Sequence, residues 1–236
     1  MTVAAVVTAA GLGTRLGTDL PKALVAVAGI PLVAWAVSRV AEVSPIVVVT
    51  VAPGHRDAFE AVLEPVEASA EAEIVLVEGG TTRQASVAAG VEALMSRDAP
   101  PSIILVHDAA RAFMPADPMR YAIGAIEAGA DGAVPVVPLV DTIVALPDED
   151  GTLGLSVDRE ALRAAQTPQA FRARALLDAH RKGADDDGEA TDDAGLVRRY
   201  GYRVVATEGH PWGFKVTVPG DLALAEHVAR RATGAT

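Results

Sequence analysis

The chain has 236 residues with 31 acidic and 20 basic side chains, a formal net charge of −11, and no cysteine. An acidic chain without a clustered basic run is not expected to bind nucleic acid. The lack of cysteine excludes disulfides and thiolate metal sites and is compatible with a cytoplasmic location. Half of the residues are apolar, but Gly29 and Pro31 interrupt the longest apolar span, so no membrane-spanning segment is expected.

Apolar, β-branched runs alternate with segments of helical periodicity along most of the chain. The runs predict strands at residues 3–8, 45–51, 73–77, 102–106, 132–136 and 203–206. The segments between them predict helices at 31–41, 55–67, 83–95 and 117–128, with Pro31 in the first turn of its helix and Pro219 in the first turn of a later one. This alternation predicts an α/β fold with a Rossmann-like, mostly parallel sheet and helices on both faces.

Residues 138–165 interrupt the alternation. Two short segments at 141–146 and 154–157 flank the acidic turn PDEDG, which predicts a β-hairpin with no helix attached. A hairpin of this length cannot bury both of its faces by itself. It is either a surface flap or an arm that packs on a second subunit, and the residues alone leave both possibilities open.

The first predicted strand runs into a loop of small residues, AAGLG at 9–13, which is followed by the cations Arg15 and Lys22. Glycine lets the backbone approach a ligand closely, and the N–H groups of such a loop bind anions. Two positive charges in the same stretch add to this effect. The loop therefore favours a polyphosphate ligand, with an ordinary strand–turn–helix connection as the alternative.

Two better-known glycine motifs do not fit this loop. A P-loop requires lysine after its last glycine, but Gly17 is followed by threonine. A dinucleotide-binding fingerprint requires a third glycine where Leu16 stands. A hydride-transferring dehydrogenase is accordingly not expected.

His107 and Asp108 follow the strand predicted at 102–106. Ligands of open α/β sheets bind beyond the carboxyl ends of the strands, so Asp108 is expected to face the same crevice as the glycine loop. A carboxylate beside a polyphosphate indicates a bridging divalent cation such as Mg²⁺, although a helix N-cap explains this segment equally well. For His107 we expect a hydrogen-bonded structural role.

A second pair of glycines, Gly79 and Gly80, precedes Thr81, Thr82 and Arg83 at the start of a predicted helix. The glycines again permit close approach of the backbone, whereas the threonines and Arg83 fit a helix cap and a first turn. No HExxH, GxSxG or SxxK motif occurs, so no nucleophile for covalent catalysis is evident. The residues instead favour catalysis by positioning and charge neutralisation, as in phosphoryl transfer.

Several motifs, taken in order and spacing, resemble one known family. They are AAGLGTRLG with Pro21-Lys22, GGxxR at 79–83 with Ser86, VHDAAR at 106–111, Asp141-Thr142, VDR at 157–159, QTPQ at 166–169, TDDA at 191–194 and KVT at 215–217. The set is similar to the 2-C-methyl-D-erythritol 4-phosphate cytidylyltransferases of non-mevalonate isoprenoid biosynthesis and covers nearly the whole chain. The first motif marks only the wider nucleotidyltransferase class, while VHDAAR, TPQ and KVT are more specific.

This resemblance implies a single nucleotidyltransferase domain of glycosyltransferase-A-like fold over residues 1–236, and a homodimer joined by the arm at 138–165. It implies transfer of CMP from CTP to methylerythritol phosphate with release of pyrophosphate, and Mg²⁺ held by Asp108. A cytidylyltransferase for another acceptor, such as ribitol 5-phosphate, is one alternative. A nucleotide sensor without catalysis is another, and the presence of both Lys22 and Asp108 argues against it.

The resemblance also implies roles for individual residues. Arg15 and Lys22 would stabilise charge on the α-phosphate during transfer, and Lys215 would orient the reacting phosphates. Thr142 and Arg159, on the arm, would bind methylerythritol phosphate in the site of the neighbouring subunit. The nucleotide would be bound by Ala9, Ala10, Gly11, Gly13, Gly80, Ser86 and Ala109.

Three positions depart from the usual pattern of the family. Thr81 stands where members often carry an acid near the ribose, Ala112 stands where proline is common, and Ala23 stands where glutamine is usual. None of the three is a phosphate-binding cation. Only the charged ribose contact is put in doubt, and the effect of Thr81 on nucleotide selectivity stays open.

Overall fold

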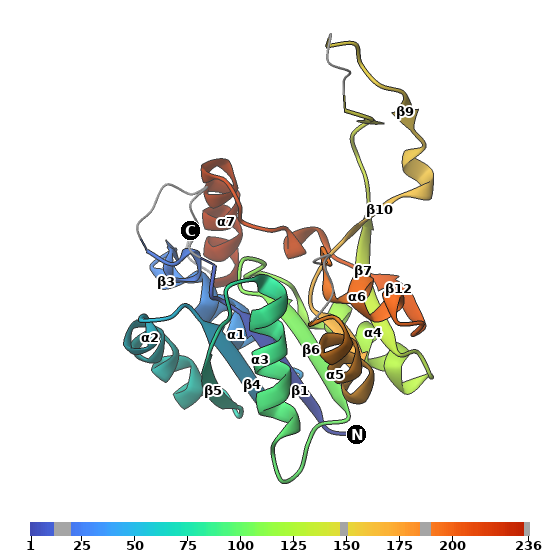
Figure 1. Ribbon diagram of the computed structural model, residues 1–236. Helices are drawn as coiled ribbons and strands as arrows, with labels where there is room; N and C mark the ends of the chain where they lie inside the picture. Colours follow the sequence, from blue (N-terminus) through green and yellow to red (C-terminus); the bar gives the residue numbers. More distant parts are fainter. Residues whose placement is uncertain (12–19, 147–150, 185–189, 234–236) are drawn as a thin grey trace.

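The computed structural model describes residues 1–11, 20–146, 151–184 and 190–233. The strands of its main sheet are β1 (Val3–Thr8), β4 (Ile46–Val51), β5 (Glu73–Glu78), β6 (Ile103–Asp108), β7 (Gly132–Pro138), β10 (Arg163–Ala165), β11 (Gln169–Arg172) and β12 (Val204–Glu208). In this part of the chain they form one eight-stranded sheet in the order β10-β7-β11-β6-β1-β4-β5, with β12 paired to β7 (Figure 1). The predicted α/β fold class is confirmed.

The half of the sheet around β1 is parallel and carries the topological switch point. β1 lies between β4 and β6, and β5 follows β4, all in parallel register. In this register Thr8 lies beside Thr50 on one side and Asp108 on the other, so three carboxyl ends finish level at one edge. The chain order reverses at β1, which is where ligands of doubly wound sheets bind.

All six predicted strands are present within a few residues of their expected bounds. The strands β10 and β11 were not predicted, and neither was the small hairpin of β2 (Ala26–Val27) and β3 (Ile30–Pro31). β11 is four residues long and runs antiparallel between β6 and β7. Both strands with which β11 pairs are distant from it in sequence. A run of four residues is also too short to show a periodicity by which it could be predicted.

Helices cover both faces of the sheet and separate two cores. They are α1 (Leu32–Ala41), α2 (Arg56–Ser69), α3 (Arg83–Met95), α4 (Ala116–Glu127), α5 (Ala173–Lys182), α6 (Asp193–Arg199) and α7 (Pro219–Thr233). Side chains of α1, α2 and α4 pack with Ala5 and Val7 of β1, whereas those of α3, α5 and α6 pack with Ala4 and Val6. This alternation is that of a strand covered on both sides, as the uniformly apolar runs predicted.

The four helices predicted in the first half are confirmed, while α5 and α6 were not predicted. Pro219 begins α7 as expected, but Pro31 belongs to β3 and is the N-cap residue before α1 rather than part of its first turn. Among the helices in the described part of the chain, none has the length and apolar composition that crossing a bilayer requires.

One glycine fixes how closely α3 approaches the sheet. A Cβ atom at Gly90 would lie 2.6 Å from Cγ1 of Val6, so any side chain there would push the helix away from β1. The close contact matters because Arg83 and Ser86 lie in the first turn of the same helix. The close packing of α3 on β1 at Gly90 therefore sets the position of Arg83 and Ser86 at the edge of the sheet.

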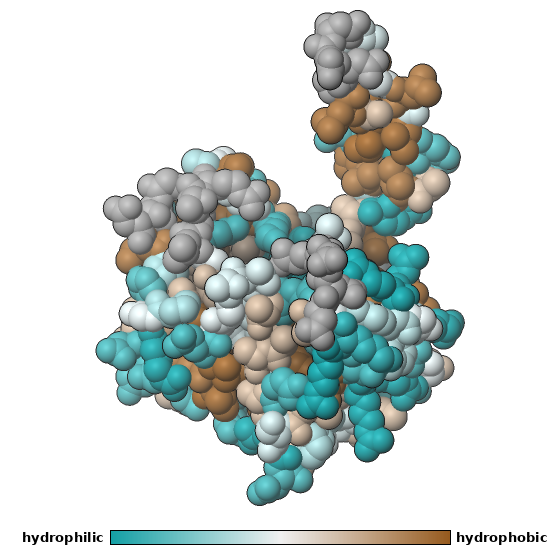
Figure 2. All heavy atoms as spheres, in the orientation of Figure 1, coloured by the Kyte–Doolittle hydropathy of each residue, from teal (hydrophilic) through white to brown (hydrophobic). Residues whose placement is uncertain are grey.

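A hairpin projects from the body between β7 and β10 (Figure 1). Its strands β8 (Ile143–Val144) and β9 (Ser156–Val157) pair antiparallel, so the predicted hairpin is present with shorter strands than expected. Most of its acidic turn, residues 147–150, lies outside the described residues. Apolar side chains cover the arm in Figure 2, and Leu146 and Leu155 are 90% and 87% exposed.

Candidate active site

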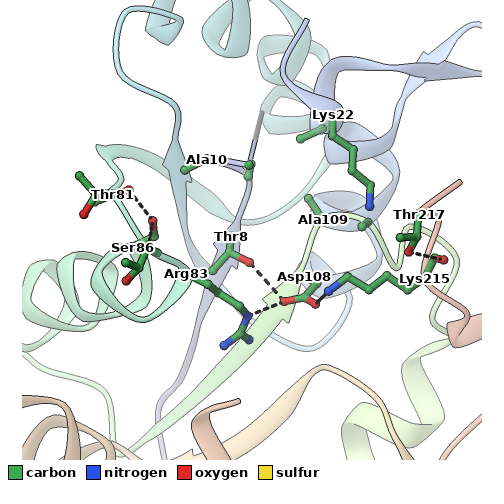
Figure 3. Close-up of a pocket in the computed structure, with 16 residues that line it drawn as sticks. Thr8, Ala10, Lys22, Thr81, Arg83, Ser86, Asp108, Ala109, Lys215 and Thr217 are labelled. Carbon is green, nitrogen blue, oxygen red and sulfur yellow. Dashed lines mark hydrogen bonds and ion pairs between the residues drawn. The ribbon is translucent and has the colours of Figure 1, made fainter. Parts of the chain in front are cut away.

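A cavity of about 350 Å³ opens at the carboxyl ends of β1 and β6 (Figure 3). The residues of the sequence prediction that line it are Ala9, Ala10, Gly11, Lys22, Gly80, Ser86, Asp108, Ala109 and Lys215. Its lining also includes residues for which we predicted no role, among them Thr8, Arg83, Ala110 and Thr217. Segments from both ends of the chain therefore meet at the predicted crevice.

Four predicted site residues are not found at this cavity. Gly13 and Arg15 lie outside the described residues. Thr142 and Arg159 are exposed on the projecting arm and do not line the cavity of their own chain. The guanidinium of Arg159 instead donates a hydrogen bond to the carbonyl oxygen of Val140, within the arm.

The backbone brings Lys22 back to the start of the glycine loop. The N–H of Ala9 donates to the carbonyl of Thr50 (2.8 Å), and the N–H of Lys22 donates to the carbonyl of Gly11 (3.2 Å). Beside Gly11 there is open space where a Cβ would stand. A ligand can accordingly come close to the backbone at Gly11, in the cavity that Lys22 also lines.

The second glycine pair draws α3 against the same loop. A Cβ at Gly79 would lie 2.7 Å from Cβ of Ala10 and 2.9 Å from Oγ of Ser86, so only glycine allows this approach. The hydroxyl of Thr82 accepts from the N–H of Ala85 (3.1 Å) and caps the helix, as expected. The buried Ser86 donates its hydroxyl to the carbonyl of Thr82 (2.9 Å), so its oxygen remains available as an acceptor.

Asp108 ends β6 with its carboxylate between two cations. Its Oδ1 accepts from Nε of Arg83 (3.0 Å) and its Oδ2 from Nζ of Lys215 (2.7 Å), while the hydroxyl of Thr8 lies 3.4 Å from Oδ1. Burial alone would raise the pKa of this carboxyl group, but the charges of Arg83 and Lys215 outweigh burial and hold it well below its usual range. The alternative role as a helix N-cap is wrong, because α4 begins only at Ala116.

His107 points away from the cavity into the protein. It is fully buried, and its Nδ1 lies 3.0 Å from the hydroxyl of Thr167, which also accepts from the backbone N–H of Asp108 (3.0 Å). Burial lowers the pKa of the imidazole to about 4, so the ring is neutral near pH 7. The expectation of a hydrogen-bonded structural histidine is confirmed, and the contact helps to fix the backbone of Asp108.

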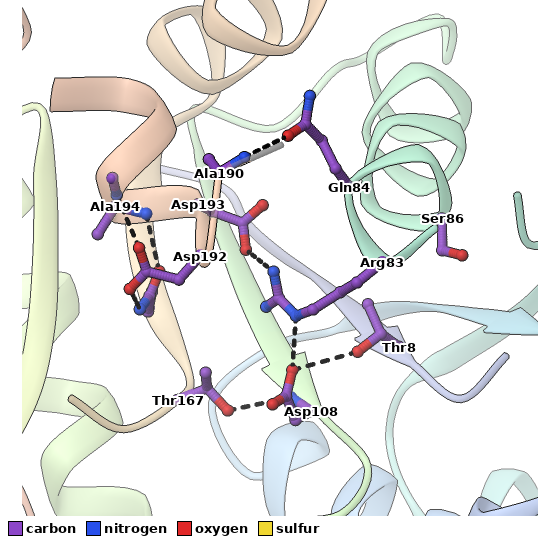
Figure 4. Close-up of polar contacts among 12 residues, drawn as sticks. Thr8, Arg83, Gln84, Ser86, Asp108, Thr167, Ala190, Asp192, Asp193 and Ala194 are labelled. Atoms are coloured by element: carbon purple, nitrogen blue, oxygen red, sulfur yellow. Dashed lines mark hydrogen bonds and ion pairs between the residues drawn. The ribbon is translucent and has the colours of Figure 1, made fainter. Parts of the chain in front are cut away.

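Arg83 is the charged cavity residue that the sequence reasoning missed. It lies in the first turn of α3 and donates from Nη1 to Oδ2 of Asp193 (2.8 Å) as well as from Nε to Asp108 (Figure 4). Burial alone would lower the pKa of its guanidinium, but the two carboxylates raise it above its ordinary value. Its partners are 110 and 25 positions away, so no local pattern distinguishes it from an ordinary first-turn residue.

Lys215 reaches the cavity from a segment just before α7. It follows the short 3₁₀ helix η4 (Pro211–Gly213), and the N–H of its neighbour Val216 donates to the carbonyl of Ala110 (2.9 Å). The side chain of Val216 is fully buried in a cluster of apolar residues under α7. This anchor on the loop after β6 places the ammonium group of Lys215 next to Asp108.

Asp108 is the cavity residue that could hold a magnesium ion arriving with a polyphosphate. In the described part of the chain no group of three or more His, Asp or Glu side chains could hold a metal by itself. Mg²⁺ commonly binds through one or two carboxylates together with phosphate oxygens and water, and Asp108 can supply such a carboxylate. Both of its oxygens are paired with cations, so a metal ion would have to displace one of them.

The arrangement can bind an anion and neutralise its charge. Lys22, Lys215 and Arg83 line the cavity together with the small residues Ala9, Ala10, Gly11, Gly80 and Ala109. The hydroxyl of Thr8 lies beside the carboxylate of Asp108, but this carboxylate is paired with two cations and is a weak base. This lining therefore fits reactions that need positioning and electrostatic stabilisation rather than a covalent intermediate.

Comparison with known proteins gives a consistent result along the whole chain. Residues 3–231 match the family described as 2-C-methyl-D-erythritol 4-phosphate cytidylyltransferase. Enzymes of that name from Streptomyces coelicolor and Saccharopolyspora erythraea are 42% and 43% identical, over 97% of this chain and 85% and 99% of theirs. The crystal structure of the enzyme of that name from Thermus thermophilus shares 37% identity at a TM-score of 0.78, covering 98% of this chain and 100% of that one.

Proposed function

The chain belongs to the 2-C-methyl-D-erythritol 4-phosphate cytidylyltransferase family, and we infer that it is a nucleotidyltransferase that transfers CMP from CTP to 2-C-methyl-D-erythritol 4-phosphate in isoprenoid biosynthesis. The observation that carries this chemistry is the convergence of Lys22, Asp108 and Lys215, from three distant segments, on one cavity. A nucleotide sensor without catalysis could lose Lys22 or Asp108 and still fold, and both are present in this chain.

The proposed reaction needs no general base, because a phosphate monoester is already an anion near neutral pH. An oxygen of the acceptor phosphate forms a bond to the α-phosphorus of CTP. The bond between that phosphorus and the oxygen bridging to the β-phosphate breaks, and its electrons leave with pyrophosphate. The obstacles are repulsion between two anions and the loss of freedom in bringing them together.

We propose that the cations of the cavity reduce the repulsion between the two anionic substrates. Lys22, together with Arg15, would stabilise charge on the α-phosphate, and Lys215 would leave Asp108 to orient the reacting phosphates. Asp108 would hold Mg²⁺, which supplies neutralisation of the phosphate charge when it is bound. Support comes from the carboxylate of Asp108 in the cavity lining and from the cations on either side of it.

The nucleotide would lie on the small residues at the other side of the cavity. Their backbone N–H groups can approach a phosphate or a base because no large side chain intervenes. The proposed contacts are Ala9, Ala10, Gly11, Gly13, Gly80, Ser86 and Ala109. Thr81 and Thr82 bring hydroxyl groups to this part of the lining, and we expect the ribose there to be bound without a carboxylate.

We propose that the arm completes the site of a second subunit in a homodimer. Its exposed leucines form an apolar surface. An isolated two-stranded hairpin is only marginally stable in water, and exposed apolar patches mark interaction sites, so this surface favours a partner. Thr142 and Arg159 are exposed on the same arm, away from the cavity of their own chain. In the dimer they would bind the acceptor phosphate at the partner's cavity.

Replacing Arg159 with alanine is expected to raise the KM for methylerythritol phosphate about 10- to 100-fold, because a charge-assisted contact to a phosphate is lost. The KM for CTP should stay within about twofold, since the proposed contact of Arg159 is with the acceptor phosphate and not with the nucleotide. Steady-state kinetics with each substrate varied in turn give both constants. A normal KM for the acceptor would remove Arg159 from the site.

Mixing two variants that are each expected to be strongly impaired at low acceptor concentration tests whether the arm acts across subunits. Lys22→Ala and Arg159→Ala chains are denatured together and refolded, so that about half of the dimers contain one chain of each kind. Each such dimer has one cavity with an intact Lys22 facing an intact Arg159, so the mixture should regain about one quarter of wild-type activity at low acceptor concentration. No recovery, in a mixture that native mass spectrometry shows to contain the mixed dimer, would mean that the arm serves its own chain.

The assignment itself is tested by incubating the protein with CTP, Mg²⁺ and methylerythritol phosphate and measuring pyrophosphate and the cytidylylated product. ATP, GTP and UTP replace CTP in parallel reactions, and ribitol 5-phosphate replaces the acceptor. We expect product only from CTP with methylerythritol phosphate, and none after chelation of the metal. A cytoplasmic location, compatible with the cysteine-free sequence, is part of the same proposal and is checked by cell fractionation.

A further inference from the structure

The TDDA motif at 191–194 contains a buried carboxylate that has no role in the account above. Asp193 is the first residue of α6 and is 2% exposed. Its Oδ2 accepts from Nη1 of Arg83 (2.8 Å), and its Oδ1 lies 3.1 Å from Nε2 of His180 (Figure 4). Burial would raise the pKa of this carboxyl group, but His180 and Arg83 outweigh burial and lower it, so it remains charged.

The two cations on Asp108 are held in different ways. Arg83 is tied at two points of its guanidinium, to Asp108 through Nε and to Asp193 through Nη1. Lys215 pairs with Asp108 alone among the described residues, and its side chain is 41% exposed against 29% for Arg83. Arg83 therefore has two carboxylate partners and Lys215 has one among the described residues.

The attachment of Asp193 to the sheet is rigid. Asp192 caps α6 by accepting from the N–H of Gly195 (2.8 Å) and also accepts from Nε2 of Gln169 (2.8 Å). Oε1 of the same Gln169 accepts from the N–H of Ala194 (3.0 Å). Gln169 begins β11 and lies in register with Val106 of β6, the strand that carries Asp108.

We propose that Asp193 is a positioning residue of the transfer reaction: by holding Arg83 it leaves Oδ2 of Asp108 free to exchange Lys215 for the incoming metal and phosphates. A guanidinium with a single carboxylate partner tends to take both of its oxygens in a paired fork. Such a fork uses Nε and Nη2, as in Arg181 with Glu92. Arg83 donates to Asp108 from Nε alone, and the bond from its Nη1 to Asp193 holds the guanidinium in this orientation. The proposal rests on the proposed function and extends it to a residue that does not line the cavity.

A double-mutant cycle on Arg83 and Asp193 tests this coupling. Asp193→Asn keeps the shape and removes the charge, and we expect it to lower kcat about tenfold and to weaken binding of Mg²⁺ with CTP, measured calorimetrically without acceptor. Arg83→Gln should lower kcat at least as much. If Asp193 acts through Arg83, the double variant is within about twofold of Arg83→Gln; if the two losses multiply instead, the proposal is wrong.

Controls separate positioning from folding. Arg198→Gln, at an exposed position of the same helix α6, changes a charge outside this network and should leave kcat within about twofold of wild type. Arg83→Lys keeps a charge for Asp108 but lacks the separate nitrogens with which the guanidinium reaches Asp108 and Asp193 in a fixed geometry. It should therefore show the defect expected of Asp193→Asn, and it provides the test if Asp193→Asn fails to fold. Normal kcat and normal binding of Mg²⁺ with CTP in folded Asp193→Asn or Arg83→Lys would overturn the inference. Absence of turnover in the wild-type protein would instead overturn the proposed function.

Discussion

Lys22→Ala is expected to lower kcat about 10²- to 10³-fold, the size of effect seen when one donor to a transition state is removed. The residue lines the cavity, and its backbone N–H closes onto the carbonyl of Gly11. Alanine preserves that backbone contact, so the loop should keep its course while the ammonium charge is lost. Because the charge on the α-phosphate peaks during transfer, the loss should fall on kcat more than on the KM for CTP.

The matched control is Lys182→Ala, which removes a lysine from an exposed ion pair with Asp178 on α5. Such surface pairs contribute little, so its kcat and stability should stay near wild type. Rapid-quench measurement of the first turnover reports the chemical step directly. If Lys22→Ala retains wild-type kcat, Lys22 has no part in the chemistry.

The sequence was informative wherever structure is encoded by long local patterns. The parallel strands β1, β4 and β6 are apolar at nearly every position because both faces are covered, and their bounds were predicted within a few residues. β11 could not be found in this way. It exists because β6 and β7 each offer it a hydrogen-bonding edge, and those partners are distant in sequence.

The same distinction holds within the site. Asp108 and Lys215 were predicted from motifs, and both line the cavity that lies at the edge where parallel strands end. The bridge from Arg83 to Asp193 was not predicted, because it joins a first-turn arginine to the start of a seven-residue helix that no periodicity marks. Thr142 and Arg159 cannot be tested within one chain, since the role expected for them belongs to a partner's cavity.

Asp108→Asn should lower kcat/KM about 10²- to 10³-fold, because it removes the carboxylate proposed to hold Mg²⁺. It also removes the carboxylate that pairs with Lys215 and leaves Arg83 paired with Asp193. We expect the Mg²⁺ concentration for half-maximal activity to rise as well, since a neutral amide is a weaker ligand than a carboxylate. A titration of activity against Mg²⁺ at fixed CTP measures this shift. An unchanged metal requirement would show that the ion is held elsewhere.

The acid stability of Asp108→Asn provides a second, independent readout. The pKa of Asp108 is lowered in the folded protein, so its ion pairs contribute stability that is present above the ordinary value of 3.8 and is lost as the pH falls toward the folded-state value. The variant lacks this titration, so its free energy of unfolding should fall less steeply than that of wild type below about pH 4. Asp117→Asn, in an exposed pair with Arg120, is the control and should follow the wild-type curve. Parallel curves for wild type and Asp108→Asn would mean that the two cations do not hold this carboxylate in solution.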